Sequence, residues 1–426
     1  MIFDRENFIR IIFLELLSVT PLLIILGNVV PPFPIKIHFI GFGLTFLVAL
    51  YLILINPTKK WIAYFGLLFL IVQLFLDQWH IKDLIDFFFG PFVLVIAIDL
   101  VANKRIPMSL MLKYEKRYFT LMWLPILIAV FQYFHLLPLT FWNATYVNSA
   151  IIDGVYYPRP NGFLYHGAEL SVILCFTSFQ LFFKKEQQAF WLLLFLILAS
   201  LLTYFKAVSG CIILIFGFYI TFVNRGSLSQ FRILDRKRIF AYGSLLVAVI
   251  VPFLFYYFKS VYEKTGYFFL PQLLTGRGSI WNVYIDSIKE FSFWNYLFGK
   301  GIGSPFELFQ TYASPKNWWP LTVSDHLKDT YDPHNAVLSI FLNTGFLGFV
   351  FMFVIYKIIY TQVSKLAPSA AWNRMVFWGL LLIPLFTIGI TIPIYEMAIL
   401  WTSLTFIFIR WNAYGNPSGS INLSEK

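Results

Sequence analysis

The pair His334-Asn335 carries residue types that suit proton transfer at a membrane boundary. A polar, aromatic-rich segment precedes the pair and an apolar stretch follows it. The order Asp332-Pro333-His334 predicts a helix start, with Asp332 near the cap and Pro333 at the first helical position. A helix start favours the neutral form of an imidazole, which accepts a proton from a hydroxyl, so His334 is a candidate general base. The alternative is a polar cap residue at a membrane interface.

Two arginines are candidate cations for binding a diphosphate. Arg159 stands between Pro158 and Pro160, which make the backbone stiff and extended. Arg277 belongs to Thr275-Gly276-Arg277-Gly278, just ahead of a predicted helix, where a guanidinium and backbone N–H groups hold an anionic headgroup together. Each has a second interpretation: Arg159 as a solvated loop charge, and Arg277 as an arginine that reaches lipid phosphate.

Other polar features are weaker signals. Glu169 enters an apolar span, where charges are costly and face the bundle interior, so it is expected to pair with Arg159 or to join the site. Residues 299–303 (Gly-Lys-Gly-Ile-Gly) resemble a phosphate-binding loop but lack the Walker spacing, and are interpreted as a tight turn. The sequence has no D-x-D pattern and no His/Cys cluster with zinc spacing, so no metal and no cofactor are predicted.

The composition shows what must position these residues. The chain has 426 residues, of which 59% are hydrophobic and 12% charged, whereas soluble domains carry about 25% charged residues. The chain is therefore predicted to be a polytopic membrane protein. Cys175 and Cys211 both lie in apolar stretches and are interpreted as small core residues, with no disulfide framework.

The predicted fold class is an all-α polytopic membrane protein with about twelve transmembrane helices and one large extracytoplasmic loop that contains amphipathic helices. The chain 1–426 is expected to form a single integral membrane domain, with the large loop at 259–333 and a flexible cytoplasmic tail at 411–426. The predicted spans are 8–27, 35–55, 60–76, 84–102, 118–137, 167–183, 189–204, 207–223, 239–258, 334–356, 375–391 and 397–410.

The distribution of Lys and Arg predicts the orientation. With the N-terminus in the cytoplasm, two basic clusters fall in cytoplasmic loops. The topology is then N-in and C-in, and His334, the loop 259–333 and the segment 138–166 lie outside the cytoplasm. The same charges explain the basic balance as membrane electrostatics, so no nucleic-acid partner is predicted. The clusters are Lys104, Arg105, Lys113, Lys116 and Arg117, and Arg225, Arg232, Arg236, Lys237 and Arg238.

The large loop contains a predicted amphipathic helix that lies on the membrane surface or against the spans. Its polar residues fall on the other faces of the helix. The apolar face consists of Ile280, Trp281, Tyr284, Ile285, Ile288 and Phe291, and the polar residues are Asn282, Asp286, Lys289 and Glu290.

Four motifs in this order resemble the O-antigen ligase/O-antigen polymerase superfamily of membrane glycosyltransferases. The resemblance covers roughly residues 155–360, and the motifs fall on one predicted membrane face. They are Arg159-Pro160-x-Gly162, Ser209-Gly210, Thr275-Gly276-Arg277 with Trp281 and Gly301-x-Gly303, and His334-Asn335-x9-Gly345-x-x-Gly348.

The resemblance implies a large fold similar to GT-C type glycosyltransferases in the bacterial inner membrane, with the active site facing the periplasm. It implies an undecaprenyl-diphosphate-linked glycan donor, a glycan acceptor hydroxyl, contact with membrane lipids and a chain-length regulator protein as a partner. His334 matches the catalytic histidine of the family, and Arg277 and Arg159 match arginines that engage the donor diphosphate. Asn335 and Glu169 are further candidates for substrate binding.

One position departs from the family pattern. Many relatives carry an arginine after the serine of the second motif, whereas Gly210 and Cys211 follow Ser209 here. Lys206 lies close by and is the candidate substitute, although a lysine does not bind phosphate bidentately.

Three functions remain as alternatives at this point. The favoured one is a polymerase that joins lipid-linked oligosaccharide repeats by metal-independent, inverting transfer. A ligase that moves finished polysaccharide onto lipid A–core shares the same motifs. A transporter of lipid-linked glycans is less favoured, because the sequence shows no internal repeat and its charges gather at the outer face.

Overall fold

A computed structural model describes residues 5–29, 37–56, 60–76, 81–102, 106–138, 149–152, 155–158, 160–164, 167–182, 187–202, 206–222, 277–313, 335–366 and 398–415. These residues are helical apart from short turns and one hairpin. The elements are α1 (Arg5–Ser18), α2 (Thr20–Val29), α3 (Ile37–Ile55), α4 (Lys60–Leu74), α5 (Ile81–Ala102), α6 (Met108–Tyr133), β1 (Ser149–Ile152), β2 (Val155–Pro158), α7 (Gly167–Phe182), α8 (Gln187–Leu202), α9 (Lys206–Phe222), α11 (Arg277–Lys289), α12 (Phe293–Phe298), α13 (Ser304–Tyr312), α14 (Ala336–Leu366) and α16 (Ala398–Gly415).

Two described helices are long and apolar enough to cross a membrane, at Ile37–Ile55 and Ala336–Val354, and the bent pair α1 and α2 makes a third if it forms one span. The shorter apolar helices are Lys60–Leu74, Phe89–Val101, Glu169–Leu181, Gln188–Leu202 and Val208–Gly217. The described helices coincide with all the predicted spans except 239–258 and 375–391, which lie outside the described residues. The chain is thus a helical membrane protein, and the number of twelve spans stays a prediction.

The first predicted span corresponds to a bent pair of helices. α1 and α2 meet at an angle of 52° around Val19. Pro21, the second residue of α2, has no N–H to donate and its ring crowds the carbonyl one turn earlier. The proline therefore explains why the range 8–27 is a bent pair and not a straight helix.

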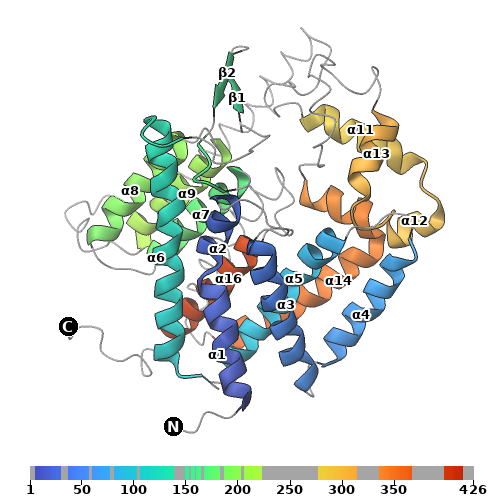
Figure 1. The fold of residues 1–426 in the computed structure, drawn as a ribbon, viewed down its shortest axis with the longest axis horizontal. Helices are drawn as coiled ribbons and strands as arrows, with labels where there is room; N and C mark the ends of the chain where they lie inside the picture. Colours follow the sequence, from blue (N-terminus) through green and yellow to red (C-terminus); the bar gives the residue numbers. More distant parts are fainter. Residues whose placement is uncertain are drawn as a thin grey trace.

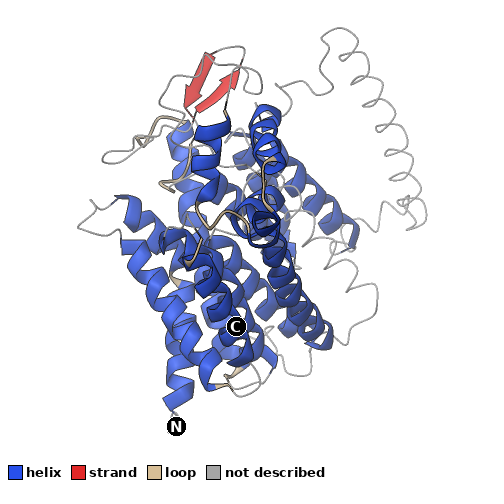
Figure 2. Ribbon diagram, turned by 90° about the vertical axis from the view of Figure 1, so that its right-hand side faces the viewer, coloured by secondary structure: helices blue, strands red, loops and turns tan. Residues whose placement is uncertain are grey.

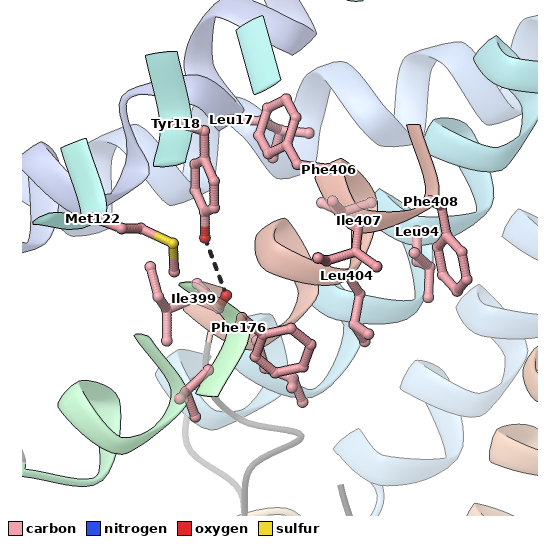
Figure 3. Close-up of a cluster of buried hydrophobic side chains, with 14 of the residues drawn as sticks. Leu17, Leu94, Tyr118, Met122, Phe176, Ile399, Leu404, Phe406, Ile407 and Phe408 are labelled. Carbon is pink, nitrogen blue, oxygen red and sulfur yellow. Dashed lines mark hydrogen bonds between the residues drawn. The ribbon is translucent and has the colours of Figure 1, made fainter. Parts of the chain in front are cut away.

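Two helices form the centre of the bundle. The residues of α5 from Phe89 to Val101 are buried on every side, as expected for a helix that is apolar all round. α16 packs against α5, α6 and α7, with Leu404, Phe406 and Ile407 in the core (Figure 3). Because lipid is as apolar as these side chains, close packing and buried polar contacts hold such helices together.

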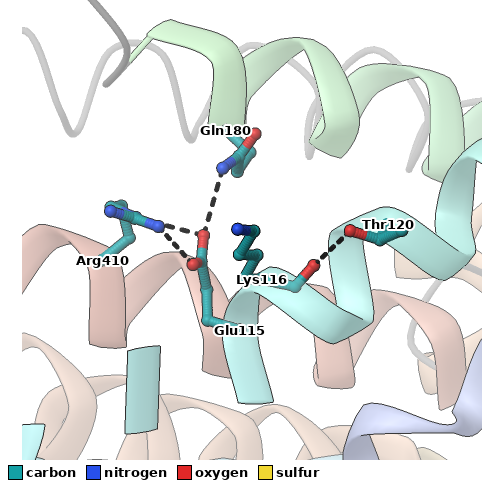
Figure 4. Close-up of polar contacts among 5 residues, drawn as sticks. All are labelled: Glu115, Lys116, Thr120, Gln180 and Arg410. Carbon is teal, nitrogen blue, oxygen red and sulfur yellow. Dashed lines mark hydrogen bonds and ion pairs between the residues drawn. The ribbon is translucent and has the colours of Figure 1, made fainter. Parts of the chain in front are cut away.

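Polar contacts join α16 to its neighbours at two positions along the helix. The Tyr118 hydroxyl on α6 lies 2.9 Å from Thr402 Oγ1 and 2.8 Å from Ser403 Oγ, in the core shown in Figure 3. Further along, Arg410 forms a two-pronged ion pair with the carboxylate of Glu115, which also accepts a 3.2 Å hydrogen bond from Gln180 Nε2 (Figure 4). Helices α6, α7 and α16 are thereby joined.

The last helix extends past its predicted end. α16 reaches Gly415, and Trp411 and Asn412 are buried. The expectation that the flexible tail begins at 411 is therefore wrong by at least five residues, because these side chains pack in the bundle. Residues 416–426 lie outside the described part of the chain.

The short hairpin and the helices of the large loop lie at the same end of the bundle. β1 and β2 pair antiparallel, from Ser149 opposite Pro158 to Ile152 opposite Val155. In Figure 1 the hairpin, α11 and α13 lie at one end, and the start of α1 lies at the other. Figure 2 shows the hairpin projecting from the same end after a quarter turn.

Candidate functional site

Of the predicted site residues, Glu169 and Asn335 have described side chains, and the segments next to the others are described. Arg159 and His334 lie outside the described residues. Arg277 and Lys206 are the first residues of α11 and α9, and their side chains are not described. Glu169 lies half-buried in the first turn of α7, where the helix dipole favours a carboxylate. The convergence of these residues in one pocket stays a prediction.

Asn335 is the N-cap of α14. Its Oδ1 atom accepts hydrogen bonds from the N–H groups of Val337 at 3.0 Å and Leu338 at 3.1 Å. Its carbonyl accepts the first helical bond, from Ser339 at 2.9 Å. The prediction that Asp332 is near the cap is therefore wrong for this helix. His334 precedes the cap in sequence, so the argument from a position in the first helical turn no longer supports a neutral imidazole.

The turn at residues 299–303 packs against the middle of α14. The N–H groups of Lys300 and Gly301 donate to the carbonyls of Leu342 and Asn343, at 2.9 and 3.1 Å. The N–H of Gly303 donates to Asn343 Oδ1 at 3.1 Å, and that of Gly299 caps α12. The interpretation as a tight turn is confirmed. Four N–H groups that a phosphate would need already have partners within the protein.

α14 is interrupted where this turn meets it. Gly345 has φ 58° and ψ −154°, a backbone conformation outside the helical region. An interruption after Thr344 disturbs the helical hydrogen bonds of the preceding turn, and the carbonyls of Leu342 and Asn343 accept from the loop. The glycine of the fourth motif thus has a structural role: it lets the loop dock on the helix.

The helices of the large loop pack on the first turns of α14. Val283, Tyr284 and Leu308 form a buried cluster with Leu342 of α14, and Leu338 packs at its edge. The predicted amphipathic helix is present as α11, but its buried face includes Val283, whereas Ile285 is exposed. The face is rotated from the prediction because α13 packs against α11 and buries Val283 in the cluster with Leu308 and Phe309.

A second contact joins the loop to the N-terminal part of the chain. Gln73 Nε2 at the end of α4 donates to the carbonyl of Phe298, the last residue of α12, at 3.4 Å. Gln73 is fully buried. The loop unit formed by α11, α12 and α13 is thus attached to α14 by its turn and to α4 by a side chain.

The segment that follows Arg159 is buried in the bundle. Pro160, Asn161 and Leu164 are buried, and Phe163 is half-buried. The Oε1 atom of Gln132 on α6 accepts hydrogen bonds from the N–H groups of Asn161 and Gly162, at 3.1 and 2.9 Å. The turn that follows Arg159 in the sequence is therefore anchored to α6.

The serine of the second motif joins two helices. Ser200 Oγ on α8 donates to Ser209 Oγ on α9 at 3.0 Å, and both side chains are buried. Cys175 and Cys211 are buried, as predicted from their apolar surroundings, and their sulfurs are not joined in a disulfide. In the described part of the chain, no three His, Cys, Asp or Glu side chains are grouped so that they could hold a metal ion.

Sequence reasoning missed Gln132, Asn343 and Gln73. Each is a buried amide on an apolar helix that binds the backbone of a distant segment. An amide inside an apolar stretch is a signal, because it needs a partner when buried. The partner itself is set by tertiary packing.

Comparison with known proteins gives one match. Residues 188–353 match the family described as O-antigen ligase. The matched region runs from α8 into α14 and includes the second, third and fourth motifs, whereas Arg159 and Glu169 precede it. The match confirms the resemblance to the O-antigen ligase/polymerase superfamily. Neither the comparison with curated proteins nor that with solved structures finds a match.

Proposed function

We propose that this chain, of which residues 188–353 match the O-antigen ligase family, is a polymerase that joins undecaprenyl-diphosphate-linked oligosaccharide repeats on the periplasmic face of the bacterial inner membrane. Topology is N-in and C-in in this proposal. A chain-length regulator protein is a proposed partner.

The buried cluster that α11 and α14 share, with α13 between them in the contacts, is the observation that supports this proposal most. α11 begins with Arg277, and α14 begins directly after the His334-Asn335 pair. Both helices contribute to one buried cluster, α11 with Val283 and Tyr284. Two motifs that are far apart in sequence therefore belong to one packed unit, as a shared site requires.

The proposed reaction needs one base and two cations. The acceptor hydroxyl oxygen attacks the anomeric carbon of the donor, and its proton passes to the imidazole of His334. The bond from this carbon to the diphosphate oxygen breaks, and the electron pair leaves with undecaprenyl diphosphate. Arg277 and Arg159 neutralise the departing charge through bidentate contacts, with Lys206 as a third cation. Direct attack inverts the anomeric carbon. Glu169 and Asn335 are placed beside the substrate in this proposal.

The test uses purified protein in nanodiscs with its lipid-linked repeat unit and no lipid A–core. Glycan length on the carrier is read by gel or mass spectrometry. A ladder that grows, that persists with a metal chelator and that disappears with His334→Ala is the expected result. Arg277→Lys should reduce turnover, because the planar fork is lost although the charge is kept.

Two variants of exposed residues outside the motifs serve as matched controls. His135→Asn replaces an exposed histidine with φ 57°, a backbone conformation that asparagine tolerates. Arg117→Lys changes an exposed arginine paired with Glu15. Both should polymerise like wild type. Wild-type turnover of His334→Ala would show that His334 is not the base, and wild-type turnover of Arg277→Lys would show that the guanidinium of Arg277 is not needed for the reaction.

A ligase is the second candidate, because the matched family carries that description. A ligase leaves the repeat unit unextended and transfers glycan only after lipid A–core is added. Absence of product in both assays would favour the third alternative, a transporter of lipid-linked glycans.

A further inference from the structure

The turn that follows Arg159 is closed by the side chain of Asn161, one of its own residues. Asn161 Nδ2 donates to the carbonyl of Leu164 at 2.9 Å, and its Oδ1 accepts from the N–H of Phe163 at 3.1 Å. Gly162 has φ 69°, and an added Cβ there would lie 2.3 Å from the carbonyl oxygen of Pro125 on α6. The turn is therefore closed on itself and lies directly on a helix.

Gln132 connects this turn to the end of α6. It is 1% exposed. Its Oε1 accepts from the N–H groups of Asn161 and Gly162, and its Nε2 donates to the carbonyl of Pro138 at 3.0 Å. One amide thus satisfies two donors in the turn and one acceptor in the chain that leaves α6. A carboxylate or an aliphatic side chain cannot meet all three.

A third element holds the far side of the turn. Asn28 Nδ2 near the end of α2 donates to the carbonyl of Phe163 at 3.2 Å. Leu164 is buried in the main hydrophobic core. The backbone from Pro160 to Leu164 is thereby fixed by α2 and α6 together, and the strand β2 ends at Pro158 on the other side of Arg159.

We propose that Gln132 is a positioning residue for Arg159: its amide holds the turn at Asn161 and Gly162, so that the adjoining arginine meets the diphosphate of the donor lipid. The inference rests on the proposed function, in which Arg159 engages that diphosphate. Arg159 needs such support because a long flexible side chain binds well only when its backbone is fixed. Gln132 acts through the backbone and touches no substrate.

The experiment measures binding of undecaprenyl diphosphate to the purified full-length protein in nanodiscs, alongside turnover. Gln132→Leu removes all three hydrogen bonds at similar volume and should weaken binding about tenfold, the scale of losing a buried hydrogen-bonded anchor. Gln132→Glu keeps the acceptor oxygen for the two N–H groups and should stay within about threefold of wild type. Asn28→Leu releases the same turn from the other side and should act in the same direction as Gln132→Leu.

A matched control separates positioning from general loss of stability. Gln180 is a buried glutamine at the distant end of the bundle, where it donates to Glu115. Gln180→Leu should lower the Tm yet leave binding of undecaprenyl diphosphate unchanged. Weakened binding in Gln180→Leu equal to that in Gln132→Leu at equal Tm would overturn the positioning role.

The decisive measurement is whether the losses of binding caused by Gln132→Leu and by Arg159→Ala add up in the double variant. If Gln132 acts through Arg159, adding Gln132→Leu or Asn28→Leu to Arg159→Ala should weaken binding no further. Additive losses overturn the proposal, as does wild-type binding by Gln132→Leu while Arg159→Ala binds weakly. Wild-type binding by Arg159→Ala is a separate result, because it removes Arg159 from the proposed function and the reason for positioning it. If Gln132→Leu does not fold, the Asn28→Leu pair gives the same comparison.

Discussion

The backbones of Gly299 and Gly345 lie directly against each other. A Cβ added to Gly345 would lie 2.5 Å from the amide nitrogen of Gly299, and one added to Gly299 would lie 2.4 Å from the amide nitrogen of Thr344. Both glycines have positive φ, 78° and 58°. The large loop therefore docks on α14 through a contact between two backbones, and any side chain at either position would separate them.

Gly345→Ala is expected to lower the free energy of unfolding by about 3 kcal/mol, because alanine must take a glycine conformation and its methyl group meets backbone atoms. The proposed polymerising activity should fall with it, since the loop unit carries α11. Thermal unfolding and the glycan ladder measure the two effects.

Gly43→Ala is the control for that substitution. An added Cβ at Gly43 on α3 meets nothing within 4 Å, and its φ is helical. This variant should be as stable as wild type or slightly more stable. Equal stability of Gly345→Ala and Gly43→Ala would show that the contact with Gly299 is dispensable.

Asn335→Ala should cost about 1 kcal/mol of stability through loss of the α14 cap. Asn335→Asp keeps an oxygen that accepts from Val337 and Leu338, so it should retain both stability and activity if capping is its role. Thermal unfolding and turnover of both variants provide the measurement. A stable but inactive Asp variant would instead assign the amide to substrate contact.

Arg410→Met should destabilise the protein by about 3 kcal/mol, because it leaves the buried carboxylate of Glu115 without its guanidinium. Glu115 is fully buried, whereas the Arg410 side chain is 23% exposed. Glu115→Gln should therefore be milder, because the exposed part of the arginine keeps contact with polar surroundings. Thermal unfolding of the single and double variants checks this order, and the double variant should be more stable than Arg410→Met. The reverse order would mean that an unpaired Arg410 costs more than an unpaired Glu115.

Tyr312 should lose its proton at a higher pH than an ordinary tyrosine. Its hydroxyl donates to Glu290 Oε2 at 2.7 Å, and this hydrogen bond, followed by partial burial and the charge of the carboxylate, raises the pKa of Tyr312 above its ordinary value. A raised pKa means that the contribution to stability is complete below pH about 10 and is lost as the pH rises through the folded pKa.

The difference in tyrosinate absorbance between wild type and Tyr312→Phe follows this titration. Glu290→Gln should lower the pH at which Tyr312 titrates, because it weakens the hydrogen bond to the carboxylate and removes the negative charge. Titration of Tyr312 at the same pH in Glu290→Gln and in the parent protein would contradict the assigned cause.

The positions of the helices were largely predictable, and their deviations have local causes. Apolar length predicted the helices of the bundle, but Pro21 bends the first one and packing of Trp411 prolongs the last. The cap of α14 is Asn335 although Asp332 and Pro333 form the stronger sequence signal. Several residue types can cap a helix, so the residue types alone do not decide which one does.

The sequence by itself determined the helical membrane character, the family-type motifs and the tight turn at residues 299–303, because hydropathy and glycine spacing act locally. Only the tertiary structure decided how the motifs are supported. It brought Gln132 to the turn at Asn161 and Gly162, and Gly345 to Gly299. Buried amides and close backbone contacts depend on partners far along the chain, and no local sequence pattern specifies which segment will pack against them.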